Sequence, residues 1–326
     1  MSEETPAAGP ALVADNEDDD SGFSEISDDS SAYSASLASS IKHYRTENGR
    51  TYHSYREGKY QIPNDETELD RMDLQHHLFE MTLGGKLQEA PIGKIHNCLD
   101  VGTGTGIWAM DFAEEHPEAQ VIGIDLSPTQ PEHVPPNLQF IIDDAEDTWH
   151  YRAPFDFIHS RMMVGSFGDW PAFLSRAFEW TVPGGWIELQ DVETVQSDDG
   201  SFTLDPPSCD LAKWWSLATE GFEKAGRKMR DQSKDHKRLL EEAGYVDVQE
   251  KVYKWPINSW PKDKQMKQFG VWTRENTSAI LEGLALAPFT RFLGWTVDEV
   301  QVLLAGCRKD LKNTSLHAYW TIRMTA

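Results

Sequence analysis

The sequence predicts an α/β domain built on a mainly parallel, seven-stranded sheet with helices on both faces. Three observations support this. Short apolar runs alternate with helical patterns between residues 98 and 192, a glycine-rich segment joins the first run to the next helix, and acidic residues follow the next two runs. Such alternation is typical of parallel strands whose connections cross over as helices.

One long helix is predicted before the sheet begins. Asp65 can cap its N-terminus, with Glu68 three residues later as the partner in a capping box. Apolar side chains then recur at helical spacing as far as Leu83. Gly84 and Gly85 end the pattern, as glycines often do at helix C-termini.

The sheet region follows as regular strands and helices, and a turn at Val182-Pro183-Gly184-Gly185 precedes the fifth strand. Predicted strands span 98–101, 121–124, 140–142, 155–158 and 186–192, and predicted helices span 107–116 and 170–180.

The strand–helix rhythm breaks after Asp199, where aromatic and proline residues become frequent. Thr296 and Glu299 form a capping-box pattern that opens the last helix. We predict helical insertions at about 205–232 and 262–295, a helix at 233–243, and the sixth and seventh strands at 246–253 and 317–324.

The segment Leu99-Asp100-Val101-Gly102-Thr103-Gly104-Thr105-Gly106 follows the first strand and opens a helix. Glycines let the backbone turn tightly and approach a ligand without a Cβ in the way. The helix N-terminus behind them offers free N–H groups and a partial positive charge, which suit an anionic group. We therefore expect this loop to bind a nucleotide-like cofactor.

Acidic residues end the next two strands. Asp125 lies where a carboxylate can accept hydrogen bonds from both hydroxyls of a ribose. Asp143-Asp144-Ala145-Glu146 ends the third strand, and an acceptor there can bind an adenine amino group. Because the carboxyl ends of parallel strands share one edge of a sheet, the loop and these acids are expected to meet there.

The glycine spacing separates two classes of cofactor. Dinucleotide-binding enzymes use G-x-G-x-x-G, whose third glycine would fall at Ile107. This chain has G-x-G-x-G preceded by Asp100, which resembles the first motif of class I S-adenosylmethionine-dependent methyltransferases. Asp125 resembles the acidic end of their second strand, Asp144–Glu146 their third motif, and Pro183-Gly184-Gly185 the turn before their fifth strand.

The resemblance implies a Rossmann-like methyltransferase domain at residues 96–326, with residues 41–95 as a helical cap over the cofactor site. A nicotinamide-dependent oxidoreductase and a non-catalytic nucleotide-binding protein are the alternatives. The resemblance implies that S-adenosylmethionine is bound by Asp100, Gly102, Thr103, Gly104, Gly106, Asp125, Leu126, Asp144, Ala145 and Glu146.

Further segments resemble the fungal LaeA-like methyltransferases, over roughly residues 41–326. Members of that group regulate fungal secondary metabolism in the nucleus beside velvet-type partners, or act inside metabolite gene clusters. The resemblance implies methyl transfer to a small-molecule acceptor at O, N or C, or alternatively a nuclear regulator in a velvet-type complex. The segments that carry it are Glu47–His53, Pro63–Asp65, Gly84–Leu87, Asp144–Trp149 and Phe155–Arg161.

Catalysis of methyl transfer needs alignment of the acceptor and exclusion of water, and an oxygen acceptor also needs a base. His159 ends the fourth strand and is the candidate catalytic residue, with a purely structural histidine as the alternative. Glu188 and Asp191 are further candidates, on opposite faces of the fifth strand. Arg161 is interpreted as a structural or carboxylate-pairing residue.

Aromatic residues crowd the two insertions. We expect most of them to be core residues and a few to wall an apolar acceptor pocket. Tyr52, Tyr55 and His77 of the cap are also candidates for lining the site. The aromatic residues of the insertions are Trp214, Trp215, Phe222, Trp272, Phe289, Phe292 and Trp295.

Composition restricts the partners. The net charge is -24, and residues 1–40 carry ten acidic residues without any Lys or Arg, so we predict a disordered, acidic, Ser-rich tail there. A negative surface disfavours direct nucleic-acid binding, and no apolar stretch is long enough to cross a membrane. Three widely spaced cysteines predict free thiols and no metal site. The N-terminus lacks the apolar core of a signal peptide, so the expected location is the cytoplasm, the nucleus or both.

Overall fold

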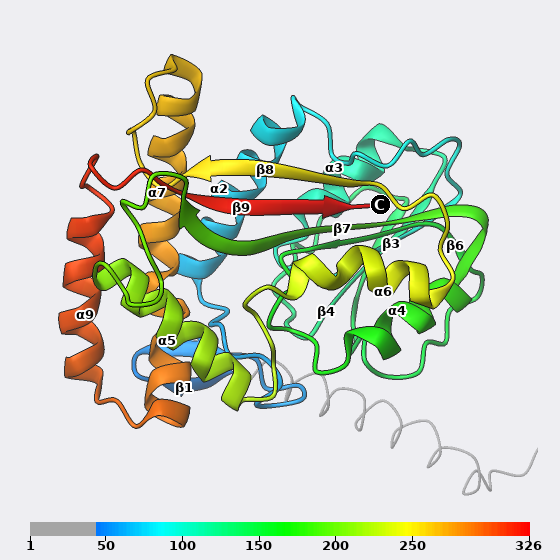
Figure 1. Ribbon diagram of the computed structural model, residues 1–326. Coiled ribbons are helices and arrows are strands. Elements are labelled where there is room, and N and C mark those ends of the chain that lie inside the picture. The colour runs from blue at the N-terminus through cyan, green and yellow to red at the C-terminus, as the bar shows by residue number, and fades with distance from the viewer. Residues whose placement is uncertain (1–43) are drawn as a thin grey trace, which may run out of the picture. The chain divides into compact units, whose positions relative to one another are not determined.

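The computed structural model describes residues 44–326, so the predicted tail at 1–40 lies outside the described residues (Figure 1). A seven-stranded sheet has the order β5-β4-β3-β6-β7-β9-β8. β9 is antiparallel to both of its neighbours, and every other pair is parallel, which confirms the predicted sheet. Its strands are β3 (Asn97–Val101), β4 (Gln120–Asp125), β5 (Leu138–Ile142), β6 (Phe155–Arg161), β7 (Thr181–Ser197), β8 (Glu250–Pro256) and β9 (Ala318–Thr325).

Helices cover both faces of the parallel part, as the sequence predicts. Successive residues of a strand point to opposite faces. Cys98 of β3 packs in one cluster with Trp108, whereas Leu99 packs on the other face with Phe173 and Leu240. These side chains come from α3 (Ile107–Glu115), α4 (Trp170–Glu179) and α6 (His236–Ala243).

A second group of helices packs around the antiparallel end of the sheet (Figure 1). Beyond Gln190, β7 leaves β6 and pairs with β9 as far as Ser197 opposite Ala318. The late segments predicted as helical insertions contain α5 and α7, and one hydrophobic cluster joins these helices to the strands. The helices of this half are α2 (Glu66–Leu83), α5 (Asp210–Lys224), α7 (Lys264–Gly283), α8 (Leu286–Pro288) and α9 (Val297–Asp310), with short turns η1 (Gln232–Asp235) and η2 (Phe289–Leu293).

The N-terminal cap differs from the all-helical expectation. It begins with a two-stranded hairpin of β1 (Arg45–Glu47) and β2 (Arg50–Tyr52), and α2 follows. Asn48 and Gly49 connect the strands with φ angles of 50° and 79°. The Asn-Gly pair tolerates positive φ and matches the twist of a tight hairpin. The sequence therefore contained the signal for this hairpin, although it was not predicted.

The helix caps are borne out in part. Asp65 accepts a hydrogen bond from the Glu68 backbone N–H, and Gly84 ends α2 in the left-handed conformation. The Glu68 side chain does not complete a capping box, because its carboxylate is buried and bonds to Arg71. The capping box at Thr296 and Glu299 is confirmed.

Two strand boundaries also differ from the prediction. The Val182–Gly185 segment lies within β7 as an irregularity, because the register passes from Phe155 opposite Thr181 to Phe157 opposite Trp186. β8 starts at Glu250 rather than at Val246. Cys98, Cys209 and Cys307 are free, as predicted. Among the described helices, none is both long and apolar enough to span a membrane.

Candidate active site

The glycine-rich loop connects β3 to α3 at the carboxyl edge of the sheet. Gly102, Gly104 and Gly106 all have positive φ angles, of 73°, 59° and 82°. An added Cβ at Gly104 would lie 3.2 Å from the Sδ of Met72 on α2, which passes over the loop. The loop therefore requires glycine both for its backbone conformation and for the space above it.

Asp125 lies at the end of β4 and faces the loop. Its two carboxylate oxygens accept hydrogen bonds from the backbone N–H groups of Gly104 and Ser127, each at 2.9 Å. Burial of its carboxyl raises the pKa of Asp125 to about 6, although both of these hydrogen bonds lower it. Each oxygen keeps a further lone pair for a ligand hydroxyl.

The acidic segment after β5 is held by cations. Asp144 forms an ion pair with Lys59 and also accepts a hydrogen bond from the Glu146 N–H at 2.9 Å. The Glu146 carboxylate bonds to Arg227 at 2.8 Å and lies 3.3 Å from the Lys59 ammonium. Both predicted acids therefore line the cavity with their carboxylates already engaged, whereas Asp143, which also lines it, has no ion pair among the described residues.

Asp100 and His159 form a buried pair on neighbouring strands. The His159 Nδ1 lies 2.8 Å from one Asp100 oxygen, and the Thr103 hydroxyl donates to the other at 2.6 Å. The imidazole stacks on Trp108 with ring centroids 3.6 Å apart. An ionised Asp100 requires a proton on Nδ1. In the neutral imidazole the lone pair then lies on the buried Nε2, which has no hydrogen-bond partner in the described chain.

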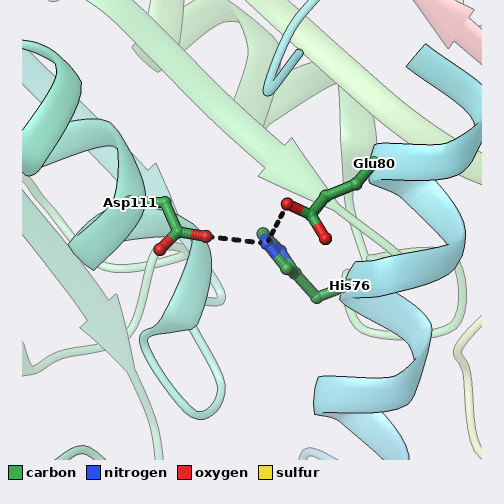
Figure 2. A group of neighbouring side chains, drawn as sticks. All are labelled: His76, Glu80 and Asp111. Carbon is green, nitrogen blue, oxygen red and sulfur yellow. Dashed lines mark ion pairs between the residues drawn. The ribbon is translucent and has the colours of Figure 1, made fainter. Parts of the chain in front are cut away.

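A second polar group surrounds His76 where α2 lies beside α3 (Figure 2), and Arg161 of β6 also contacts this histidine. His76 Nδ1 lies 3.0 Å from the Arg161 guanidinium, while Nε2 lies 2.9 Å from Asp111 and 4.0 Å from Glu80. Arginine can only donate, so Nδ1 must be the acceptor and Nε2 must carry the proton. His76, Glu80 and Asp111 lie close enough together for a metal ion, but a protonated Nε2 has no lone pair to offer one.

Arg161 itself lines the cavity beside the glycine loop. Burial lowers its pKa to about 10, so it remains cationic at neutral pH. In the described part of the chain it donates to His76 and packs over the ring of Phe79, but it forms no ion pair with a carboxylate. Its charge is thus available to an anionic group in the cavity.

The cavity continues from the glycine loop into a chamber between α2, α5, α7 and the antiparallel strands. Its walls are mainly apolar, and its polar residues there include Glu68, Arg71 and Asn276. The apolar wall consists of Ile62, Met162, Met229, Trp214, Trp215, Trp255, Ile280, Leu284, Trp320 and Ile322.

The structure gathers nearly all of the predicted site residues around this cavity. His159 and nine of the ten predicted cofactor-binding residues line it. Gly106 is the exception: a Cβ there would clash with the ring of Phe140, so this glycine serves the packing of α3 against β5. The nine lining residues are Asp100, Gly102, Thr103, Gly104, Asp125, Leu126, Asp144, Ala145 and Glu146.

Several other candidates lie away from the cavity. Glu188 accepts hydrogen bonds from the backbone N–H groups of Glu89 and Ala90, and Asp191 accepts one from Val164. Burial raises the pKa of Asp191 to about 7. Tyr52, Tyr55 and His77 of the cap, and Trp272 and Trp295 of the second insertion, are also not among the lining residues.

Glu68 was predicted only as a capping-box partner, and Arg71, Trp255 and Trp320 were not predicted as site residues. A Glu–Arg pair three residues apart on α2 was the available signal for the first two. Trp255 and Trp320 are opposite each other across β8 and β9, a pairing that only the sheet register creates.

Comparison with known proteins agrees with this geometry. Residues 73–250 match a family model described as a methyltransferase domain. Methyltransferase pytC of Aspergillus terreus is 40% identical over 295 residues, covering 89% of each chain. Secondary metabolism regulator LAE1 of Cochliobolus heterostrophus is 39% identical over 290 residues, covering 85% of this chain and 94% of that protein.

Solved structures include a Haemonchus contortus phosphoethanolamine N-methyltransferase 2 in complex with S-adenosylmethionine, at 15% identity and a TM-score of 0.44. The aligned part covers 79% of this chain and 52% of that one. The family match excludes the oxidoreductase alternative and confirms an S-adenosylmethionine-dependent enzyme. By its family model, its relatives and its glycine-loop site, this chain belongs to the methyltransferase domain family.

Proposed function

We propose that the protein transfers a methyl group to a small-molecule acceptor of fungal secondary metabolism. The observation that carries the proposal is the single cavity that joins the glycine loop to an aromatic chamber. A cofactor at the loop and an apolar acceptor in the chamber would then share one cavity. Relatives named as methyltransferases and secondary-metabolism regulators, at 34–40% identity, support the biological setting.

The residues of the cavity fit S-adenosylmethionine group by group. Asp125 offers two acceptor oxygens for the ribose hydroxyls, and the segment at Asp143–Glu146 offers acceptors for the adenine amino group. Arg161 supplies a cation for the methionine carboxylate. Gly102 and Gly104 leave room for the backbone to approach the ligand, since neither carries a Cβ.

S-adenosylmethionine supplies a methyl group activated by its sulfonium. The protein's own part is to hold the acceptor in line, to exclude water and to accept a proton where the acceptor releases one. His159 remains our candidate for the last role, because Asp100 orients the imidazole with its Nε2 lone pair unengaged. Trp108, stacked on the ring, keeps this geometry rigid.

The cofactor assignment is tested by replacing Arg161 with methionine and titrating two ligands. S-adenosylmethionine should bind at least ~10-fold more weakly, since hydrogen bonds to charged groups are worth about 1.5–3 kcal/mol. Methylthioadenosine lacks the amino-acid carboxylate and should bind Arg161→Met as well as it binds the unaltered protein. Arg238→Met, an exposed arginine on α6, is the control.

Equal weakening of both ligands would contradict the placement of the carboxylate at Arg161. A second comparison uses NAD, which we expect not to bind. Failure of the unaltered protein to bind S-adenosylmethionine would contradict the whole function.

The alternative role is a regulator that acts through a velvet-type partner, and the 39% identity to a protein named as a regulator supports it. Metabolite profiling of a deletion strain separates the two roles. We expect the loss of one methyl group from one product family. Loss of many unrelated metabolite families, together with a velvet-type protein in a pull-down, would instead favour the regulator.

A further inference from the structure

Glu68 is a buried carboxylate in the wall of the chamber, with a relative exposure of 2%. Its Oε1 accepts hydrogen bonds from the Arg71 side chain, at 2.9 Å from Nε and 2.8 Å in the ion pair. Its Oε2 has no hydrogen-bond partner in the described chain. Buried polar atoms are nearly always paired, so an unpaired carboxylate oxygen on a side chain that lines a cavity points to a ligand.

The surroundings of Oε2 offer no donor from the protein. A Cβ added to Gly283 would lie 3.6 Å from Oε2. The two atoms nearest to that added Cβ would be carbon atoms of Ile280 and Pro63. Arg71 also donates a hydrogen bond from its Nη1 group to the Asn276 side-chain oxygen, at 2.9 Å. On the side of Gly283, apolar groups therefore lie close to the free oxygen, while Arg71 bonds to the other oxygen.

The tryptophans of the chamber present ring surface rather than hydrogen bonds. The indole N–H groups of all four are already donated within the protein. Their acceptors are the Leu281 backbone oxygen for Trp214, and the hydroxyls of Thr194, Thr82 and Thr277 for Trp215, Trp255 and Trp320. Such walls bind flat apolar molecules without fixing their orientation.

Three cavity-lining residues have a buried polar atom without a partner in the described chain: Glu68, His159 and Ser166. His159 and Ser166 belong to β6 and the loop after it, whereas Glu68 belongs to α2 on the side of the insertions. Glu68 Oε2 is thus an unpaired polar atom on the insertion side of the cavity, where it can orient a molecule within the aromatic chamber.

Resting on the proposed function, we propose that Glu68 anchors the acceptor by accepting a hydrogen bond from its hydroxyl group. The acceptor is then a flat, neutral and largely apolar molecule that carries at least one hydroxyl. Glu68 and Arg71 already balance each other's charge, so a cationic amine would bring an uncompensated charge into the chamber. An anionic ligand would likewise bring an uncompensated charge into the chamber.

The test compares hydroxyarenes with their methyl ethers, which have the same ring but no donor. The pairs are phenol with anisole, 2-naphthol with 2-methoxynaphthalene, and 1-hydroxypyrene with 1-methoxypyrene. Binding is measured by calorimetry or equilibrium dialysis with S-adenosylhomocysteine present, so that no turnover occurs. We expect the best-fitting hydroxyarene to bind at least ~10-fold more tightly than its ether, as a charge-assisted hydrogen bond in a buried site allows.

Glu68→Gln should reduce this preference to about 3-fold or less, since a neutral amide makes a weaker hydrogen bond. Affinity for the ether and for S-adenosylhomocysteine should not change. Glu66→Gln removes the same charge from the exposed side of the same helical turn and should keep the full preference.

Three results would overturn the proposal. They are no hydroxyl preference in any of the three pairs, a preference that survives in Glu68→Gln, or a loss of S-adenosylhomocysteine affinity in that variant with the preference intact. The first of these results is measured on the unaltered protein, so it would overturn the proposal even if Glu68→Gln does not fold. Failure of the unaltered protein to bind S-adenosylhomocysteine would instead refute the underlying methyltransferase site.

Discussion

Asp125 and His159 lie on the same edge of the sheet but are held in opposite ways. Asp125 takes two backbone hydrogen bonds and has no cationic partner among the described residues, so burial dominates and its pKa rises to about 6. His159 is oriented by the Asp100 carboxylate and the face of Trp108. The first residue is thus suited to accept ligand hydrogen bonds, and the second to keep one nitrogen free.

The pKa of Asp125 predicts a pH dependence of cofactor binding. The ribose hydroxyls need the ionised carboxylate, and a pKa raised to about 6 means that the neutral acid forms below about pH 6 rather than below its ordinary pKa of about 4. Affinity for S-adenosylmethionine should be flat above about pH 7 and fall as the pH drops through 6. Calorimetry across this range provides the measurement.

Asp125→Asn is the control for that profile. At high pH it should bind about 10-fold more weakly, because the charged acceptor is lost. It should show no step near pH 6. A step of the same size in both proteins would assign the titration to another group and remove Asp125 from the ribose site.

At the scale of elements, α2 connects the cap to the site. Asp65 caps the helix and pairs with Arg50 of β2, so the hairpin and the helix start are tied together. Met72 then passes over Gly104, and Glu68 faces the chamber. One helix therefore limits the space above the glycine loop and also contributes to the acceptor side.

The glycine loop predicts a difference between two alanine substitutions. Gly104 and Gly184 both have positive φ, at 59° and 81°, so each alanine should cost roughly 1 kcal/mol of stability. The new Cβ at Gly104 would lie 3.2 Å from the Sδ of Met72, and both residues line the cavity. Gly184 does not line the cavity, and no heavy atom lies within 4 Å of its added Cβ.

We therefore expect Gly104→Ala to lose most S-adenosylmethionine affinity while Gly184→Ala keeps it, at similar melting temperatures. Thermal melts and cofactor titrations of both variants supply the comparison. Normal binding by Gly104→Ala would show that the cofactor does not press on this part of the loop.

At the scale of the whole molecule, two halves of one sheet have different tasks. The parallel strands β3 to β6 bring the predicted cofactor-binding residues to a common edge, where they line one cavity. The extension of β7, with β8 and β9, supports the helices that enclose the chamber (Figure 1).

The composition of residues 1–40 predicts that they are dispensable for cofactor binding. A truncation starting at Ile41 should keep the melting temperature and the S-adenosylmethionine affinity of the full chain, because the removed segment carries ten acids and few large apolar side chains. Removing it reduces the net charge from -24 to -14, so salt-dependent binding to basic partners should weaken. A large drop in melting temperature would place the tail inside the folded domain.

The sequence by itself determined the sheet and the cofactor edge. Period-two and helical patterns are local, and the glycine spacing, Asp125 and the Asp143–Glu146 segment lie at strand ends, where parallel pairing must bring them together. The capping residues Asp65 and Thr296 were readable for the same reason, since each acts within three or four residues of its position.

Only the tertiary structure decided which of these carboxylates remain free to bind a ligand and which side chains line the rest of the cavity. Asp144 and Glu146 are engaged by Lys59 and Arg227, which come from distant segments. The chamber unites Glu68 of α2 with the tryptophans of α5, β8 and β9, across up to about 250 residues of sequence. The sequence pattern predicts whether such side chains are buried or exposed. Their contacts depend on the register of β7 to β9 and on how the helices pack. Both are properties of the assembled core rather than of any local pattern.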